Sequence, residues 1–278
     1  MGEIILGMSV AHSPRIAHPE KAGPVFQELI AAMRRAGESL RAFEPDAAVI
    51  VSSHWVTSFN LYVDASQRHS GTLTAMECPD LLRAIPYDFP GDPELAGGIA
   101  EHGKKLGLPV IACAEPSYVL DYGVVNALKY LTPNGEIPVV PASVCLASDL
   151  DESAKFGEAM RTAILASNKR VAVISSAAFA HNLVRGPEKW PTPEEQAIDR
   201  HMIDILLRGQ IATARSLLPS FAARAKYEMG GRQLATLLGA LGGDEYAGEL
   251  YGYGPSSGSG NPVILFKPNR KSMKSAAA

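Results

Sequence analysis

The sequence predicts an α/β protein with a mostly parallel central sheet that helices cover on both faces, folded as a single domain. Short, β-rich apolar runs alternate with longer segments of helical period, which is the pattern of strand–helix–strand units. Several of these runs are continuously apolar, as expected for parallel strands buried on both faces. The chain has 278 residues, 46% of them hydrophobic and 20% charged, so it can bury one large core or two closely packed halves.

The first strand is expected at 4–10, and a helix at about 24–43 follows it, because apolar residues recur there with a period near 3.6 between charged ones. Pro45 and Asp46 end this helix, and the second strand is expected at 47–52. The later elements are read from the same two patterns: strands at 108–113, 137–144, 171–175 and 263–266, and helices at 93–105, 151–167, 192–207 and 222–241.

Three other segments complete the organisation. We expect a long loop at 66–90, stiffened by three X-Pro steps, and loops of this length in compact domains are often functional. The glycine cluster at 256–260 precedes a strand rather than a helix, so it makes a poor phosphate cradle. We assign residues 1–268 to one domain and expect the basic tail 269–278 to be disordered.

Charge and cysteine content argue against several classes of protein. The 26 basic and 29 acidic residues give a net charge of −3, which disfavours electrostatic binding of nucleic acid. The 3 cysteines (Cys78, Cys113 and Cys145) are widely spaced, so neither a disulfide framework nor a zinc knuckle is expected. The N-terminus lacks a basic segment before its short apolar run, and no stretch approaches the roughly 18 apolar residues of a membrane span. We expect a soluble, cytoplasmic protein with no membrane partner.

Three of the seven histidines come at or just beyond the ends of predicted strands: His12, His54 and His181. Ligands of parallel sheets bind beyond the carboxyl ends of the strands. One such histidine alone would more often be a hydrogen-bonded structural residue, but three at equivalent positions indicate a shared site. The remaining four lack this context: His102 and His201 fall in helical patterns and are most simply solvated, whereas His18 and His69 fall in loops and stay undecided.

Two imidazoles need an anionic partner to hold a divalent metal ion. Two histidines and one carboxylate that leave positions open suit non-haem Fe(II) oxygen chemistry, although catalytic zinc is also feasible. Glu228 stands out among the carboxylates because it begins the segment EMGGRQLATLLGAL, whose glycines would let the chain approach a site closely. The alternative interpretation is a solvated acid near the start of a helix.

At these residues the sequence resembles the class III extradiol ring-cleavage dioxygenases, the family of the protocatechuate 4,5-dioxygenase and 2-aminophenol 1,6-dioxygenase catalytic subunits. The shared motifs occur in order from residue 4 to residue 266: AHSP around His12, SSHW around His54, AHNL around His181, EMGGRQLATLLGAL from Glu228, and the closing GYGPSSGSGNPVILF. Each motif is weak alone, but their order along nearly the whole chain is fairly specific.

The resemblance implies that His12, His54 and Glu228 hold Fe(II), and that His181 is the acid/base residue beside the open face of the metal. It also implies that a catechol or aminophenol chelates the iron and that O₂ opens the ring outside the diol, a reaction of aromatic hydrocarbon catabolism. An imidazole suits proton transfer here because its unperturbed pKa is about 6.5. The expected partners are a small aromatic substrate, O₂, and either a second copy of the chain or a homologous subunit.

One position departs from the family pattern. Members usually carry Asp-His-Gly where this chain has Asp121-Tyr122-Gly123. Tyr122 is expected to contact the substrate, as His181 does, and it can donate a hydrogen bond, but a phenol is a poor base at neutral pH. Tyr122 is therefore compatible with an enzyme for another substrate, with a changed route of proton transfer, or with weakened activity. The alternative functions are a dioxygenase of a non-catechol phenol or hydroquinone, a non-catalytic paralogous subunit and a metal-binding signalling protein. Arg15 or Arg185 could pair with a carboxylated substrate.

Overall fold

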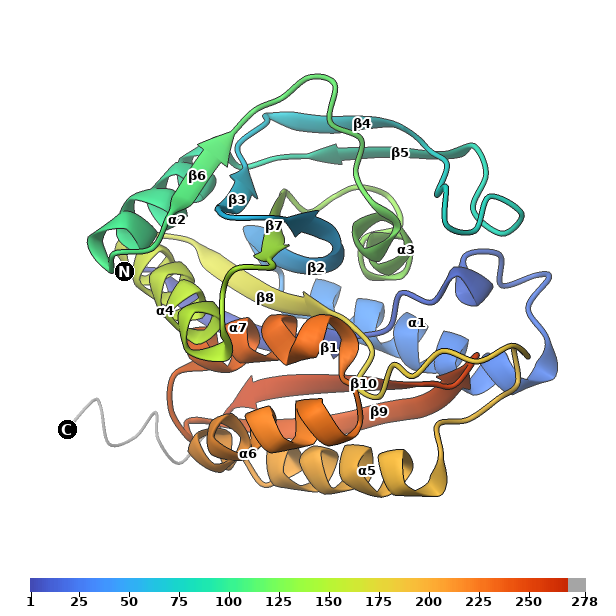
Figure 1. The fold of residues 1–278 in the computed structure, drawn as a ribbon. Coiled ribbons are helices and arrows are strands. Elements are labelled where there is room, and N and C mark those ends of the chain that lie inside the picture. The colour runs from blue at the N-terminus through green and yellow to red at the C-terminus, as the bar shows by residue number, and fades with distance from the viewer. Residues whose placement is uncertain (270–278) are drawn as a thin grey trace.

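The central feature of the structure, a computed structural model that describes residues 1–269, is an eight-stranded sheet of order β6-β3-β7-β2-β8-β1-β10-β9 (Figure 1). Its strands are β1 (Glu3–Val10), β2 (Ala47–Thr57), β3 (Leu61–Asp64), β6 (Val110–Cys113), β7 (Val139–Cys145), β8 (Arg170–Ser176), β9 (Tyr246–Ser256) and β10 (Ser259–Pro268). Strands β7, β2, β8 and β1 run parallel through the middle, whereas β10 and β9 are antiparallel at one edge. The predicted mostly parallel sheet is confirmed.

Helices cover both faces of this sheet. Helices α1 (Gln27–Ala42) and α3 (Tyr122–Leu131) pack on one face, and α2 (Pro93–Lys105), α4 (Leu150–Ala166) and α7 (Arg232–Leu241) pack on the other. Successive side chains of a strand point to opposite faces, so in β2 Ala48 and Ile50 join the first layer while Val49 and Val51 join the second. All four are buried, which explains why the run is apolar without alternation.

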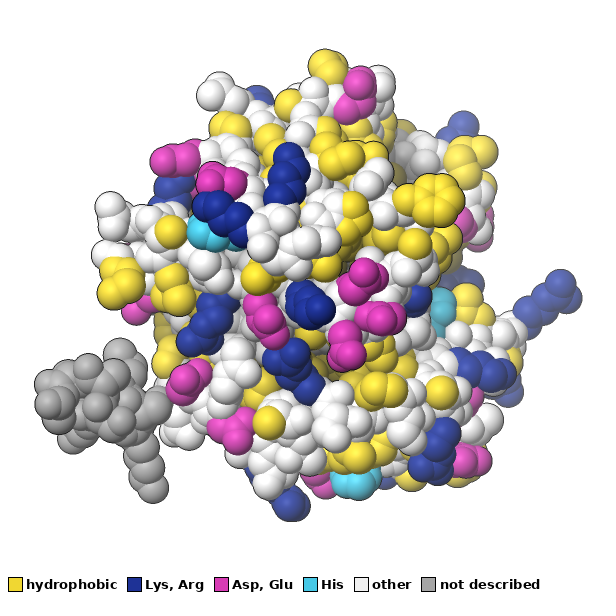
Figure 2. Space-filling model, turned by 60° about the vertical axis from the view of Figure 1, so that its left-hand side comes forward, with side chains coloured by type: hydrophobic (Ala, Val, Ile, Leu, Met, Phe, Trp, Pro, Cys, Tyr) yellow, Lys and Arg dark blue, Asp and Glu magenta, His cyan; other side chains and the backbone are white. Residues whose placement is uncertain are grey.

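The two remaining helices, α5 (Pro193–Leu207) and α6 (Ile211–Arg224), lie beside the antiparallel edge and extend the second layer. Among the described residues, none of the helices is both long and apolar enough to cross a membrane. On the face that Figure 2 shows, basic and acidic side chains are interspersed, as the near-balanced composition predicts. Apart from Asn269, the tail that we expected to be disordered lies outside the described residues.

The helix predicted at 222–241 is wrong as a single element. Helix α6 ends at Arg224, a 3-10 turn occupies Glu228–Gly231, and α7 begins only at Arg232. Met229 and the two glycines that follow it take φ values of 47°, 68° and 82°, in the left-handed region that breaks a helix. The apolar spacing continues on both sides of this turn, so the sequence pattern resembles one helix.

The predicted loop at 66–90 is also wrong, because it contains an antiparallel hairpin of β4 (Arg68–Leu73) and β5 (Ile85–Pro90). A two-stranded sheet leaves its outer edges unpaired, so it accommodates the prolines that made the segment look like a loop. Between these two strands, the connection 74–84 is irregular. His69 therefore lies on a strand and not in a loop, and its side chain is buried.

His69 attaches this hairpin to the main sheet. Its Nδ1 lies 3.3 Å from Oδ2 of Asp64 at the end of β3, and its Nε2 lies 3.1 Å from the carbonyl oxygen of Val139 at the start of β7. Burial acts to raise the pKa of Asp64, but the hydrogen bonds from His69 and Ser66 outweigh it and lower that pKa below its ordinary value. Both ring nitrogens of His69 therefore face oxygen atoms, one at the end of β3 and one at the start of β7.

Replacing His69 with leucine should therefore lower the free energy of unfolding by about 3–5 kcal/mol, since it leaves the Asp64 carboxylate buried without its partner. Urea unfolding followed by circular dichroism measures this loss. The matched control is His102→Leu on α2, where the ring makes no hydrogen bond within the described residues. The account of the hairpin attachment fails if His69→Leu costs no more than His102→Leu.

Candidate metal centre

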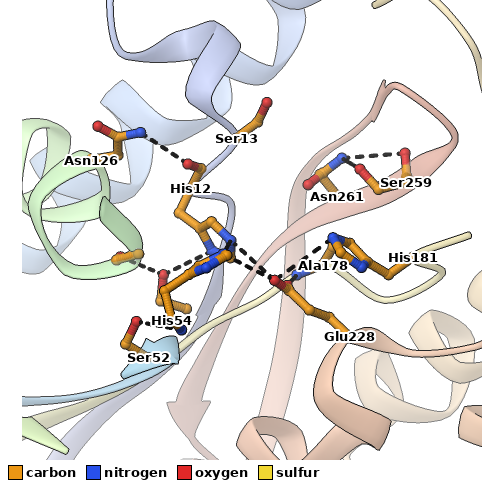
Figure 3. A network of polar contacts seen from close by, with 12 residues as sticks. His12, Ser13, Ser52, His54, Asn126, Ala178, His181, Glu228, Ser259 and Asn261 are labelled. Atoms are coloured by element: carbon orange, nitrogen blue, oxygen red, sulfur yellow. Dashed lines mark hydrogen bonds and ion pairs between the residues drawn. The ribbon is translucent and has the colours of Figure 1, made fainter. Parts of the chain in front are cut away.

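Three neighbouring parallel strands bring three histidines to one edge of the sheet. Strand β8 lies between β1 and β2, so the ends of all three strands are adjacent. His12 follows β1, His54 lies in the last part of β2, and His181 follows β8 by five residues. Figure 3 shows their rings gathered around the carboxylate of Glu228. The structure thus brings together the three histidines that the strand ends indicated, and adds Glu228 to them.

His54 lies inside its strand and not after it, which corrects the predicted end of β2 at residue 52. Strand β2 continues to Thr57, but its pairing with β7 is irregular. Val51 pairs with Ala142 and Val56 with Val144, so five steps along β2 match two along β7. A bulge of this kind re-aims side chains that a regular strand would alternate between faces.

The donor atoms of His12, His54 and Glu228 form a compact triangle. The two Nε2 atoms are 3.1 Å apart, and Oε1 of Glu228 lies 3.4 Å from Nε2 of His12 and 3.3 Å from Nε2 of His54. Bonds from a metal to such ligands are about 2.0–2.2 Å long, so ligands on adjacent corners of its coordination sphere lie about 3 Å apart. These three residues can therefore hold one divalent metal ion from one side.

Hydrogen bonds from neighbouring residues orient the His12 ring and the Glu228 carboxylate for binding a metal. The Ser176 hydroxyl donates its proton to the carbonyl oxygen of Gly123 at 2.7 Å, so it accepts from Nδ1 of His12 at 3.1 Å. Nε2 of His12 is then left with a free lone pair. The second carboxylate oxygen of Glu228, Oε2, accepts a hydrogen bond from the backbone N–H of Ala178 at 2.7 Å, which leaves Oε1 for the centre. This donor set fits a metal.

Glu228 is buried between these groups and is ionised. Burial acts to raise the pKa of this carboxyl, but the surrounding imidazoles of His12, His54 and His181 outweigh it and hold the pKa well below the usual range. The left-handed turn after Glu228 leads the chain directly into α7. The adjacent Gly230 and Gly231 are thus needed for backbone conformation, and not for the close approach to the site that we expected from the sequence.

Tyr122 packs on the ring of His54, with ring centroids 3.8 Å apart. It is the first residue of α3. The preceding Asp121 caps this end of the helix by accepting a hydrogen bond from the Val124 N–H at 3.2 Å, and it also accepts one from the Ser52 hydroxyl at 2.5 Å. On its other side, Nδ1 of His54 faces the carboxylate of Glu77 at 3.8 Å. Burial raises the pKa of Tyr122 above its ordinary value, so its hydroxyl stays protonated at neutral pH and can only donate or accept a hydrogen bond.

His181 lies beside the triangle without belonging to it. Its Nε2 is 3.8 Å from Oε1 of Glu228. Burial lowers the pKa of His181 and outweighs the opposing attraction of Glu228, so the imidazole is neutral near pH 7 and can accept a proton.

A cavity of about 220 Å³ opens beside these groups. An engineered apolar cavity of about 150 Å³ binds benzene, so this space can hold one substituted ring. Part of its wall comes from the connection of the β4–β5 hairpin, within the segment whose length pointed to a function. The residues that line it are His12, Ser13, Pro14, Arg15, Glu77, Cys78, Leu81, Tyr122, Ala178, His181, Leu183, Ser256, Ser257, Ser259 and Asn261. Of the two arginines singled out, Arg15 lines this cavity and Arg185 does not.

Several supporting residues of the site were not predicted. Ala178 and Gly123 act through backbone groups, which no side-chain pattern reveals. Asn126 donates from Nδ2 to the carbonyl oxygen of His12 at 3.0 Å, from a helix that we did not predict. Only Ser176 had a signal, as a polar residue at the end of an apolar strand.

This fold and this donor set are those expected of the family of extradiol-type ring-cleavage dioxygenases. The chain belongs to the family described as the catalytic LigB subunit of aromatic ring-opening dioxygenase, whose model matches residues 6–263. The resemblance seen in the short motifs is thereby confirmed.

Two curated relatives match over nearly their whole length. The chain is 26% identical to 3,4-dihydroxyphenylacetate 2,3-dioxygenase of Escherichia coli, over 92% of this chain and 96% of that protein. It is 28% identical to the 2-aminophenol 1,6-dioxygenase beta subunit of a Pseudomonas species, over 95% and 93%. The alpha subunit of the latter enzyme is also 28% identical, over 84% and 89%. An uncharacterized protein of Escherichia coli K12 shares the fold, with a TM-score of 0.66 at 19% identity over 95% of this chain and 99% of that one.

Proposed function

We propose that this protein is a non-haem Fe(II)-dependent dioxygenase that cleaves the ring of a small catechol or aminophenol in the extradiol manner. The observation that carries this proposal is the triangle of His12, His54 and Glu228, whose donor atoms lie 3.1–3.4 Å apart beside a cavity for one ring. Two histidines and one carboxylate on one side of a metal leave open positions, which suits Fe(II) oxygen chemistry. A structural zinc site would be closed by a fourth protein ligand.

Each residue then has a defined task. His12, His54 and Glu228 would hold Fe(II), which, when bound, supplies adjacent positions for the aromatic substrate and O₂ and passes electron density between them. The neutral His181 takes a proton from a ring hydroxyl at Nε2 and returns it as the ring opens. Tyr122 donates a hydrogen bond to a polar group of the substrate. The surrounding wall excludes water and orients the ring.

We propose that Arg15 binds the substituents of the substrate ring. This side chain makes no ion pair within the described residues, and it lines both the site cavity and an adjoining cavity of about 680 Å³. One relative is named for 3,4-dihydroxyphenylacetate and another for 2-aminophenol. We propose that catechols carrying a carboxylate are bound better than uncharged ones, because a guanidinium pairs well with a carboxylate.

Oxygen uptake by protein loaded anaerobically with Fe(II) tests the function. The panel contains catechol, 3,4-dihydroxyphenylacetate, 2-aminophenol and hydroquinone, and the products are followed by ultraviolet–visible absorption. We expect one O₂ consumed per ring opened with an ortho-diol or an aminophenol. Uptake with hydroquinone alone would instead favour the non-catechol alternative. One iron per chain with no uptake from any compound would contradict the proposal and favour a non-catalytic subunit.

Replacing Tyr122 tests its contact with the substrate. Tyr122→Phe should lower kcat/KM by about five- to tenfold, the value of one lost hydrogen bond of about 1 kcal/mol. Tyr122→His, which restores the family residue, should change the ratio of kcat/KM between catechol and 2-aminophenol. The control is Tyr62→Phe on β3, outside the residues that line the cavity. If both Tyr122 variants keep the kinetic constants of the unmodified protein, this tyrosine does not contact the substrate.

A further inference from the structure

Asp199 on α5 is a buried carboxylate behind the candidate metal centre, and no step of the proposed reaction uses it. Its exposed fraction is 0%. The backbone N–H of Ala180 donates to it, at 3.1 Å from Oδ1 and 3.3 Å from Oδ2, and the hydroxyl of Tyr253 donates to Oδ2 at 2.7 Å. Ala180 directly precedes His181, so this carboxylate is tied to the peptide that carries the proposed acid/base residue.

The segment 179–181 is held on two sides by backbone pairing. On the side of β10, Phe179 N–H donates to the carbonyl oxygen of Gly260 at 2.8 Å, and Gly260 N–H donates to that of Ala180 at 2.8 Å. On the side of Glu228, the N–H of His181 donates to the carbonyl oxygen of Lys226 at 3.1 Å, and the N–H of Glu228 donates to the carbonyl oxygen of Phe179 at 3.1 Å. Backbone partners thus satisfy the N–H groups of Phe179 and His181, and the Ala180 N–H is satisfied by the side chain of Asp199.

The absence of a side chain at Gly260 leaves room for the Asp199 carboxylate. A Cβ atom at Gly260 would lie 2.2 Å from Oδ2 of Asp199 and 2.4 Å from the hydroxyl oxygen of Tyr253, so a larger residue there would displace the pair. Burial raises the pKa of Asp199 to about 7, against the lowering by the hydrogen bonds from Tyr253 and Ala180. A group kept only to fill volume would avoid the cost of burying an ionisable carboxyl.

We propose that Asp199 is a positioning residue for His181. By fixing the N–H of Ala180, it orients the imidazole of His181 toward the open side of the triangle of His12, His54 and Glu228. This inference rests on the proposed function. It concerns His181 and not the metal, because the Glu228 carboxylate is held by the N–H of Ala178, outside the peptide that Asp199 fixes. Loss of Asp199 should therefore impair proton transfer and leave metal binding intact.

Kinetics and metal titration of Asp199→Ala and Asp199→Asn test the proposal. A misplacement of about 1 Å can cost roughly 100-fold in rate, so Asp199→Ala should lower kcat by about 10- to 100-fold while KM and Fe(II) affinity stay within about twofold. Asp199→Asn keeps the volume and one acceptor oxygen, so it should recover most of kcat. The matched control is Asp204→Asn, on the same helix but exposed, which should behave as the unmodified protein.

A crystal structure and amide exchange of Asp199→Ala provide a readout that does not depend on turnover. The His181 ring should move from its position 3.8 Å from Glu228 or occupy several orientations, and the Ala180 amide should exchange faster with solvent. A variant that melts at a lower temperature but keeps both kcat and the His181 orientation would overturn the proposal and leave Asp199 a purely structural residue. Absence of turnover in the unmodified protein would instead defeat the proposed function, while the ring orientation and the amide would still decide the role of Asp199.

Discussion

His54→Ala should reduce the affinity for Fe(II) by well over 100-fold, and His12→Ala should do the same. Changes to groups that merely orient metal ligands cost about 10- to 100-fold in affinity, so loss of one of three ligands should cost more. In each variant the remaining imidazole and Glu228 would form only two corners of the triangle whose sides measure 3.1–3.4 Å. Anaerobic titration calorimetry with Fe(II), together with iron content per chain, measures the effect.

His102→Leu on α2 is the control for this experiment, because it removes an imidazole far along the chain from the site and should leave iron binding unchanged. Thermal unfolding of each variant separates loss of a ligand from loss of the fold. If folded His54→Ala binds Fe(II) as tightly as the unmodified protein, the metal centre is not at this triangle.

His181→Ala should have the second-largest effect, a loss of turnover with the metal retained. General acid–base catalysis by a positioned side chain contributes about 10²- to 10⁴-fold, and kcat should fall by a factor in this range. Iron content should stay at that of the unmodified protein, because Nε2 of His181 lies 3.8 Å from Glu228 and the triangle is complete without it. Stopped-flow oxygen uptake measures the rate, and His201→Ala, exposed on α5, is the matched control.

This variant separates two roles for His181. Loss of iron together with activity would make it a metal ligand, contrary to our assignment. Unchanged turnover would remove it from the chemistry altogether and would shift the search for a proton acceptor to other residues of the cavity wall.

The parallel core of the fold follows from the sequence because its strands are buried on both faces and read as continuous apolar runs. Strands β1 and β8 were predicted to within one residue at each end for this reason. Helix α3 was missed because nine of its ten residues are buried and Lys129 is its one charged residue, so it lacks the charged face by which surface helices are recognised. Strand β9 and the β4–β5 hairpin depend on pairing between segments, which local patterns do not contain.

The site was partly predictable for a similar reason. Strand ends indicated His12, His54 and His181, and the family motif indicated Glu228, whose position depends on a left-handed turn that spacing alone does not reveal. Asp199 could have been found, because it shares the buried face of α5 with Ile198 and Met202 at helical spacing. An acidic residue on the apolar stripe of a helix indicates a buried carboxyl group with hydrogen-bond partners.

Iron-edge anomalous diffraction from crystals loaded anaerobically with Fe(II) tests the central claim most directly. We expect one anomalous peak bonded to Nε2 of His12, Nε2 of His54 and Oε1 of Glu228, with its open side toward the cavity that His181 lines. Iron bound elsewhere in the molecule, or no iron at this triangle in protein that cleaves catechols, would contradict the account.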